Sequence, residues 1–174
     1  GSTGTGGAGS TGSGSSGGVG VGASVGVNVG VNTIQAEIED QAAVSGKGNV
    51  TLEARGEHLQ TTEVTGGAQG ASVSFTPVAA VTVGVNTTIS RLGAGAEMKV
   101  GGGYRSMAEQ KSESTSTATG QTQGEKLAIG ASLALNTSVD TVKSSIERDL
   151  DAGGGVTVEA KGVAKSSATA TASA

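Results

Sequence analysis

Apolar residues alternate with small or polar residues over a long stretch of the first half of the chain. Valine or alanine occupies every odd position from 19 to 31, and glycine, serine or asparagine fills the even positions. A period of two over this length predicts a β-strand with one apolar face. A helix is not expected, since valine and glycine both have low helix propensity. The very small second face indicates that another layer approaches it closely, or that the segment bends into two strands.

A block of about fifty residues recurs along the chain, with Asn32, Asn86 and Asn136 in its three copies. Each asparagine is followed, after a similar interval, by a short segment with the character of a strand. Long repeats of strands bury a face against the next repeat. The sequence therefore predicts an all-β fold, a parallel β-helix (β-solenoid) built from repeats of about 50 residues. The expected division is a Gly/Ser-rich segment at 1–18 and β-solenoid repeats at 19–174, approximately 19–70, 71–124 and 125–174.

The repeat length and its glycines suggest how each block is laid out. Because solenoid repeats are often near ~20 residues, we expect one block to form two or three coils of roughly that length. Glycine-rich turns precede the strand that closes each block, which predicts sharp corners that need positive φ. In the third block, Val139, Val142, Ile146 and Leu150 also fit a helical spacing. Flanks rich in Thr and Ser favour a strand there.

Composition limits the core to something narrow. The chain has one Phe, one Tyr, no Trp and 32 Gly in 174 residues, and its apolar content is mostly Val and Ala. Small side chains remove little apolar area each, so they suit a thin core between strands. A net charge of only −4 and regularly spaced Val, Thr and Ile argue against disorder. The residues expected to carry the core are Val25, Val27, Val29, Val31, Val50, Leu52, Val83, Val85, Leu133, Leu135, Val156 and Val158.

Charge and cysteine content exclude several classes of partner. The 11 Lys and Arg are scattered and the pI is about 5.0, which argues against nucleic acid. There is no cysteine, hence no disulfide and no Cys-based metal site. The uncharged span 64–90 contains too many polar residues and Pro77 for a membrane-spanning helix. The chain starts at Gly1 without a Met and stops in mid-pattern at 170–174, so we expect it to be a piece or a processed subunit of something longer.

Several motifs together resemble the repeats of large secreted filamentous adhesins of Gram-negative bacteria, of the filamentous haemagglutinin-like and leukotoxin-type kinds. The motifs are Val-Asn-Thr-x-x-Ala-x-Ile at 31–38, Gly-Asn-Val-Thr-Leu-Glu-Ala at 48–54, Gly-Ala-Ser-Val at 70–73, Asn-Thr at 136–137 and the strand at 155–160. The resemblance implies a right-handed parallel β-helix shaft exported to the cell surface or beyond. It brings no catalytic residues with it. The segment 103–108 departs from the Val-x-Val pattern and puts the regularity of the stack in doubt.

Candidate chemistry is sparse. His58 is the single histidine and is interpreted as a solvated residue at a strand end. The acidic group Glu37, Glu39 and Asp40 is interpreted as a solvated face that discourages lateral aggregation, with a weak cation site as the alternative. The matching asparagines are interpreted as a ladder at coil corners. We therefore predict no catalytic, cofactor-binding or metal-binding residues and no cofactor.

The expected function is structural. The sequence predicts a non-catalytic segment of an extracellular bacterial filament or giant surface adhesin, self-associating through the ends of the solenoid. The alternative is a ligand-binding solenoid that recognises glycans or ice through outward Thr and Asn ladders, of which residues 115–119 are the clearest candidate. Partners would then be host or cell-surface glycans, with no nucleic acid and no membrane-spanning segment.

Overall fold

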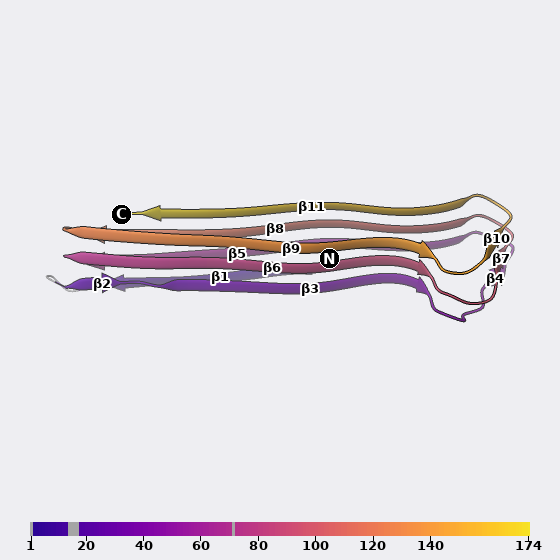
Figure 1. The fold of residues 1–174 in the computed structure, drawn as a ribbon, viewed down its shortest axis with the longest axis horizontal. Coiled ribbons are helices and arrows are strands. Elements are labelled where there is room, and N and C mark those ends of the chain that lie inside the picture. Colours follow the sequence, from indigo (N-terminus) through magenta and orange to yellow (C-terminus); the bar gives the residue numbers. More distant parts are fainter. Residues whose placement is uncertain (1, 14–17, 71) are drawn as a thin grey trace.

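The structure, a computed structural model, describes residues 2–13, 18–70 and 72–174. All regular elements in these ranges are β-strands, most of them long and almost straight (Figure 1). The strands are β1 (Ser2–Ser13), β2 (Val19–Val21), β3 (Ser24–Ile38), β4 (Ser45–Gly46), β5 (Val50–Gly70), β6 (Val73–Leu92), β7 (Met98–Val100), β8 (Tyr104–Gly124), β9 (Leu127–Ile146), β10 (Leu150–Ala152) and β11 (Val156–Ser173). The predicted all-β class is confirmed. The stretch 139–150, which also fits a helical spacing, is strand through residue 146.

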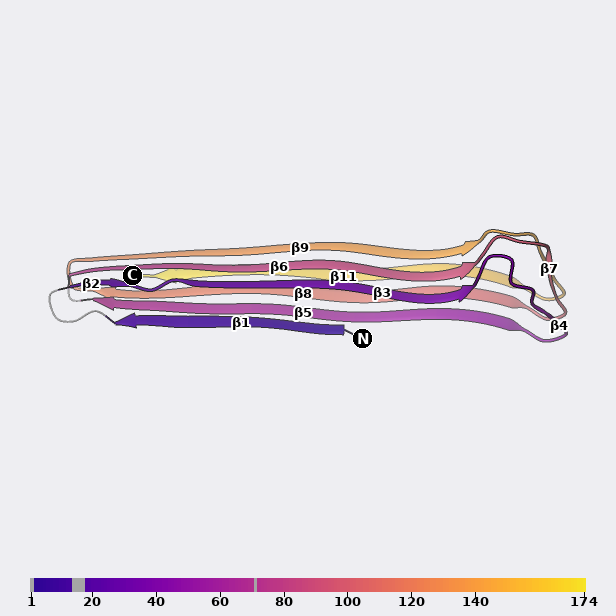
Figure 2. The same cartoon turned by 90° about the horizontal axis from the view of Figure 1, so that it is seen from below.

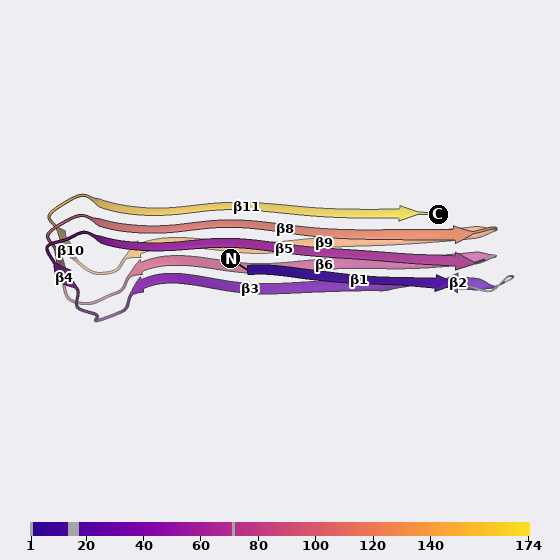
Figure 3. The same ribbon diagram turned by 180° about the vertical axis from the view of Figure 1, so that it is seen from behind.

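The strands form three sheets in which all pairings between described residues are parallel. Sheet A has the order β1-β5-β8-β11, and the small sheet C has the order β10-β7-β4. In sheet B, β2 and β3 both pair with one side of β6, and β9 pairs with its other side. The chain passes from sheet B through sheet C to sheet A and then returns to sheet B. Figures 2 and 3 show the two long sheets running side by side, joined at one end by the short strands of sheet C. This parallel arrangement is compatible with the predicted β-helix.

The strand register corrects the predicted coil size. In sheet B, Val27 pairs with Val81, which in turn pairs with Leu135. Paired residues are therefore 54 positions apart (81 − 27 and 135 − 81), which is the length of one repeat. The chain passes once through the three sheets in each repeat. The expectation of two or three short coils within each block is wrong. Strands of 20 or 21 residues in β5, β6 and β8 make the circuit long and thin.

The register also corrects the alignment of the third repeat. Asn32 pairs with Asn86, but Asn86 pairs with Asp140, and Asn136 pairs with Thr82. The shorter spacing from Asn86 to Asn136 therefore came from a chance recurrence of Asn-Thr in a sequence of low complexity. The true shortening of the third repeat occurs later, in the turn between the end of β9 and β10.

The Gly/Ser-rich segment at 1–18 lies partly in a sheet. Its residues 2–13 form β1, which pairs in parallel with β5 from His58 onward. Residues 1 and 14–17 lie outside the described part of the chain, as does residue 71, the predicted start of the second repeat. The backbone of a Gly/Ser-rich strand thus extends sheet A beyond β5.

The predicted alternation is present, but in sheet B its faces are reversed. Val25 and Val31 are 64% and 71% exposed, whereas the even-numbered Thr82 and Asn86 are 0% and 2% exposed. The core assignment is therefore wrong for the outward residues of this sheet, which are Val25, Val27, Val29, Val31, Val83, Val85, Leu133 and Leu135.

The physical reason for the reversal is the close approach of sheet A to the inner side of sheet B. A Cβ atom added at Gly26 would collide with Val64, and one at Gly30 or Gly84 would collide with the amide of Gln60. The even positions of β3 and β6 therefore accept only small side chains at these points. The valines of the same strands are left on the outer face.

Two small apolar clusters lie between the sheets. One consists of Val64, Val78, Ala80 and Ala118, in the middle of the long strands. The other, at the corner next to sheet C, contains the buried residues Leu92, Met98, Val100 and Tyr104, with Val50 and Leu52 packed against it. Val50 and Leu52 thus contribute to the core as predicted. Val156 and Val158 pair with Tyr104 and Ser106 but are 51% and 45% exposed on the last strand of sheet A.

The corner glycines serve close stacking of successive turns. Among the described glycines only Gly95 has positive φ, at 159°, which is close to an extended conformation, so the expectation of positive φ at the corner glycines is wrong. The left-handed conformation occurs instead at Gln41, with φ of 62°, in the turn after β3. A Cβ at Gly101 would lie 2.9 Å from Cα of Lys47, and one at Gly154 would lie 2.8 Å from the backbone nitrogen of Gly103. Each turn lies directly on the previous one, and side chains there would separate them.

Leu52→Lys tests whether Leu52 packs against the apolar cluster next to sheet C. Placing an ammonium group among Leu92, Met98 and Tyr104 buries an unpaired charge, and we expect a loss of about 2–3 kcal/mol of unfolding free energy. The matched control is Thr51→Lys, since Thr51 is exposed on the other side of the same strand. Thermal melting followed by circular dichroism measures both. Equal melting temperatures for the two variants would contradict the inward position of Leu52.

Candidate functional site

A ladder of polar side chains crosses the interior at the level of Asn86. Asn32 Nδ2 donates to Asn86 Oδ1 at 2.8 Å, and Asn86 Nδ2 donates to Asp140 Oδ1 at 2.9 Å. Gln110 Nε2 of sheet A donates to the same carboxylate oxygen at 2.8 Å, and Ser138 Oγ donates to Oδ2 at 2.7 Å. The predicted asparagine ladder thus exists for Asn32 and Asn86. It lies within the long strands rather than at coil corners, and a carboxylate replaces the third asparagine.

Asp140 ends this ladder as a stabilised carboxylate. Burial by itself would raise the pKa of Asp140, but the hydrogen bonds that Ser138 and Asn86 donate outweigh this and hold the pKa below its ordinary value of 3.8. Each bonded oxygen is committed to neighbours within the protein. The group therefore acts as a structural acceptor.

Hydroxyl groups join the two long sheets elsewhere in the interior. Thr82 Oγ1 of sheet B donates to Thr62 Oγ1 at 2.6 Å and accepts from Ser116 Oγ at 2.6 Å, both in sheet A. Ser106 Oγ lies 2.7 Å from Ser90 Oγ and 2.8 Å from Ser144 Oγ. These short side chains supply the hydrogen bonds that a buried polar layer requires.

His58 is buried, so its interpretation as a solvated strand-end residue is wrong. It lies within β5 at 2% exposure because even-numbered residues of this strand point inward. Neither ring nitrogen has a hydrogen-bond partner among the described residues, and the same holds for the side-chain amide of Gln60. Burial lowers the pKa of His58 below its ordinary value of 6.5, although the charge of Asp140 opposes the shift. Without a bonded hydroxyl or thiol, His58 does not form a nucleophile–base pair.

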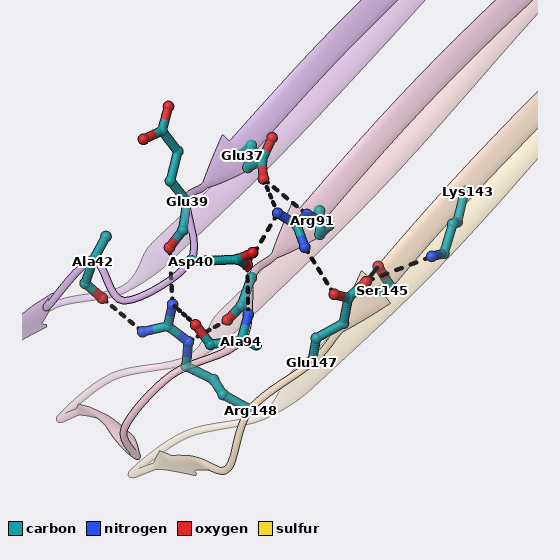
Figure 4. A network of polar contacts seen from close by, with 11 residues as sticks. Glu37, Glu39, Asp40, Ala42, Arg91, Ala94, Lys143, Ser145, Glu147 and Arg148 are labelled. Atoms are coloured by element: carbon teal, nitrogen blue, oxygen red, sulfur yellow. Dashed lines mark hydrogen bonds and ion pairs between the residues drawn. The ribbon is translucent and has the colours of Figure 1, made fainter.

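Glu37, Asp40, Arg91 and Glu147 form a charged corner cluster, which joins the three repeats where sheet B meets the turns toward sheet C (Figure 4). Arg91 binds Glu37 through Nε at 2.8 Å, Asp40 at 3.0 Å and Glu147 at 2.8 Å. Hydrogen bonds with Glu37 and then Glu147 raise the pKa of Arg91, and Arg91 in turn lowers the pKa of Glu147. Two of the three acidic residues considered as a cation site are therefore paired with an arginine.

Arg148 makes a second set of contacts in the same corner. Its guanidinium donates to the carbonyl oxygens of Ala42 at 2.6 Å, Glu39 at 3.0 Å and Ala94 at 3.3 Å, and also to that of Gly93 (Figure 4). One side chain of the third repeat thereby binds the turns of the first and the second. The sequence shows Arg148 only as an isolated basic residue, and no local pattern reveals this role.

The outer faces of the two long sheets differ in chemistry. On sheet A, most odd-numbered residues are polar or charged, with Leu59, Met107 and Val163 as apolar exceptions. The register aligns Thr65, Thr119 and Thr171 across three strands. On sheet B the outer rows are apolar, as in Val27, Val81 and Leu135. Asn32 and Asn86 belong to the interior, so the outward ladder predicted from Thr and Asn has only its threonine part at these positions.

Within the described ranges, no three His, Cys, Asp or Glu side chains gather in a group suited to a metal ion. The same ranges contain no helix with the length and apolar character needed to cross a membrane. Comparison with family models, curated proteins and solved structures found no match. The buried network and the outer faces are therefore the features from which a function can be argued.

We predict that His58 makes the fold sensitive to mild acid. Because burial lowers its folded-state pKa, the unfolded chain takes up a proton first as the pH falls below the ordinary value of 6.5. The melting temperature should be constant well above the ordinary value of 6.5 and should fall as the pH decreases through and below that value. His58→Gln, a neutral variant, should lose this step, because the chain has no other histidine. An equal pH dependence in both proteins would place the titrating group elsewhere.

Arg148→Gln tests the bridging of the three repeats. Losing charge-assisted hydrogen bonds to carbonyls of two other turns should lower the unfolding free energy by about 2 kcal/mol. Arg55→Gln is the control, since the side chain of Arg55 is 66% exposed beside Glu53 and its loss should change stability by no more than ~0.5 kcal/mol. Chemical denaturation of both variants measures the difference. Indistinguishable midpoints would show that the contacts of Arg148 do not stabilise the fold.

Proposed function

We propose that this chain is a β-solenoid segment of an extracellular bacterial filament or giant surface adhesin, and that its role is structural rather than catalytic. The observation that supports this most strongly is the in-register parallel pairing of successive repeats in sheet B. Such pairing places like residues over like residues and lets a fold grow by adding repeats. The extracellular placement rests on the resemblance of the motifs to secreted filamentous adhesins.

The proposed mechanism is mechanical. Backbone hydrogen bonds run from repeat to repeat along both long sheets, and the ladders of Asn86 and Arg91 tie the side chains in the same direction. Together they resist bending and extension of the stack. The last strand of sheet A, β11, has 18 residues and pairs on one side only within the described chain. A strand with an open edge is a template for another strand, so we propose that segments associate end to end.

A second candidate function is ligand binding on the outer face of sheet A. The observation in its favour is that Thr65, Thr119 and Thr171 form one row and Thr61 and Thr115 another. Parallel strands put the hydroxyls of one row about 4.8 Å apart across the sheet, and the two rows lie about 13 Å apart along each strand, with Glu63, Thr117 and Thr169 between them. A regular hydroxyl array of this kind suits glycans or ice. Charged residues such as Glu63 and Lys111 lie on the same face and leave the array short, which ranks this function second.

Negative-stain electron microscopy over a concentration series tests the structural proposal. We expect rods that lengthen into uniform fibres as the concentration rises. Ala164→Lys should stop this growth, because Ala164 is exposed on β11 but pairs with the buried Ser112, so an added repeat would enclose the new charge. Ser167→Lys is the matched control, since Ser167 pairs with the outward Thr115 and would stay outside.

The outcomes of the microscopy separate the parts of the proposal. Fibres of wild type and Ser167→Lys with short rods of Ala164→Lys support association through the ends. Short rods of the wild type at every concentration would contradict self-assembly and direct attention to glycan binding by the threonine face. Shapeless particles would contradict the solenoid itself.

A further inference from the structure

The outer face of sheet B is apolar over most of its length. The outward residues near the middle of β3 and β9 are 51–71% exposed, and they are Val25, Val27, Val29, Val31, Leu133 and Leu135. The register aligns these side chains with those of β6 in continuous rows across the three strands. Charged residues first appear on this face toward the corner, at Glu37, Arg91 and Lys143. Before that point, the face offers apolar, threonine and proline side chains, with Gln35 in the same row as Lys143.

The size of this face matches one side of a specific protein interface. Three strands about 4.8 Å apart, each about fifteen residues long at about 3.3 Å per residue, cover roughly 700 Å². Two such faces in contact bury roughly 1,400 Å², within the range of stable interfaces, which is about 1,200–2,000 Å². A patch of this extent is larger than the largest apolar patch of most monomers, which is about 300–600 Å².

We propose that the outer face of sheet B binds the same face of a second copy of this chain, forming a two-fold symmetric pair. Flat sheets are usually stabilised by stacking, and the strands in Figures 1 and 2 run nearly straight and side by side. A second copy presents rows of β-branched side chains with the same spacing, so ridges of one face fit grooves of the other. A lipid surface fits less well, because Phe75 is the only aromatic residue on the face and membrane-interface sites favour Trp, Tyr, Lys and Arg.

The charged corner cluster fixes the orientation of the pair. In this pair the strands of the two copies run antiparallel and their apolar stretches lie over each other. The charged corner cluster of each copy then lies outside the contact, past the end of the partner's apolar stretch. The ion pairs of Arg91 then stay in water, and no charge is buried. The centre of the contact falls near Val27 and Val81, which are neighbours in register. Pairing through this face does not depend on association through the strand edges.

Sedimentation velocity over a concentration series tests the proposal with a pair of matched variants. V27E/V81K places an ion pair at the centre of the face, leaves the net charge unchanged and should raise the dimer dissociation constant at least ~30-fold. T61E/T115K makes the same change at paired outward positions of sheet A and should leave the dissociation constant within about 3-fold of wild type. V27T/V81T, which keeps the β-branched shape, should weaken the pair by a smaller factor than V27E/V81K. Circular dichroism melting confirms that each variant folds.

A crosslinking experiment locates the contact. The chain has no cysteine, so V81C can be joined to its counterpart by a short bis-maleimide, while T115C on the outer face of sheet A should remain uncrosslinked. A monomeric wild type at all concentrations, or an unchanged dissociation constant in V27E/V81K, would overturn the proposal. Flotation of a monomeric wild type with phosphatidylcholine vesicles would overturn it in favour of lipid as the occupant. Ala164→Lys should leave the dimer intact, which separates failure of this inference from failure of end-to-end association.

Discussion

The rest of the structure depends on how closely the two long sheets approach each other. Gly26 faces Val64, and Gly30 and Gly84 face Gln60, with no room for a Cβ atom at any of the three. A gap this narrow admits Gly, Ala, Ser, Thr and single larger side chains that fit opposite a glycine. The interior is therefore largely polar. Its larger buried apolar side chains gather in the clusters around Val64 and Leu92, and mostly small ones such as Ala54 and Ala108 are buried elsewhere. The valines of sheet B are displaced to the outer face as a consequence.

A polar interior is stable only when its groups bind one another, and the in-register stacking of repeats provides this. Because each repeat brings a similar residue to the same level, amides and hydroxyls meet partners directly above, below and across, as Asn86 and Thr82 do. The same stacking places Arg91 between acidic residues of the first and third repeats. His58, Gln60, Tyr104 and Ser112 are the exceptions, since buried polar atoms of their side chains lack hydrogen-bond partners among the described residues. The unpartnered, buried ring of His58 is why we expect the fold to respond to its protonation.

Sequence reasoning could predict the strands, their parallel stacking and the alternation within them, because these follow from period two and from the repeat. It could not say which face of sheet B points inward. A period of two divides Val27 from Asn28 but does not decide which of them is buried, and the usual preference for buried valine gave the wrong answer. The small even-numbered positions carried the signal, since glycine in a strand marks close approach. The burial of His58, the role of Arg148 and the partner of Asn86 depend on contacts between distant parts of the sequence, which no local pattern records.

A thin polar core changes where the apolar stabilisation of such a chain can come from. Covering one exposed valine removes enough apolar surface to contribute about 1.5 kcal/mol, and the interior of a single copy buries few such residues. In the proposed pair, the rows of Val25, Val27 and Leu133 become the centre of a sandwich, with a polar layer on either side. Association through the open strand edges would lengthen the stack of repeats. Pairing through the outer face of sheet B would thicken the stack in a direction perpendicular to that growth. Because the charged corner cluster lies at one end of the face, it limits the apolar contact and selects the antiparallel orientation of the strands.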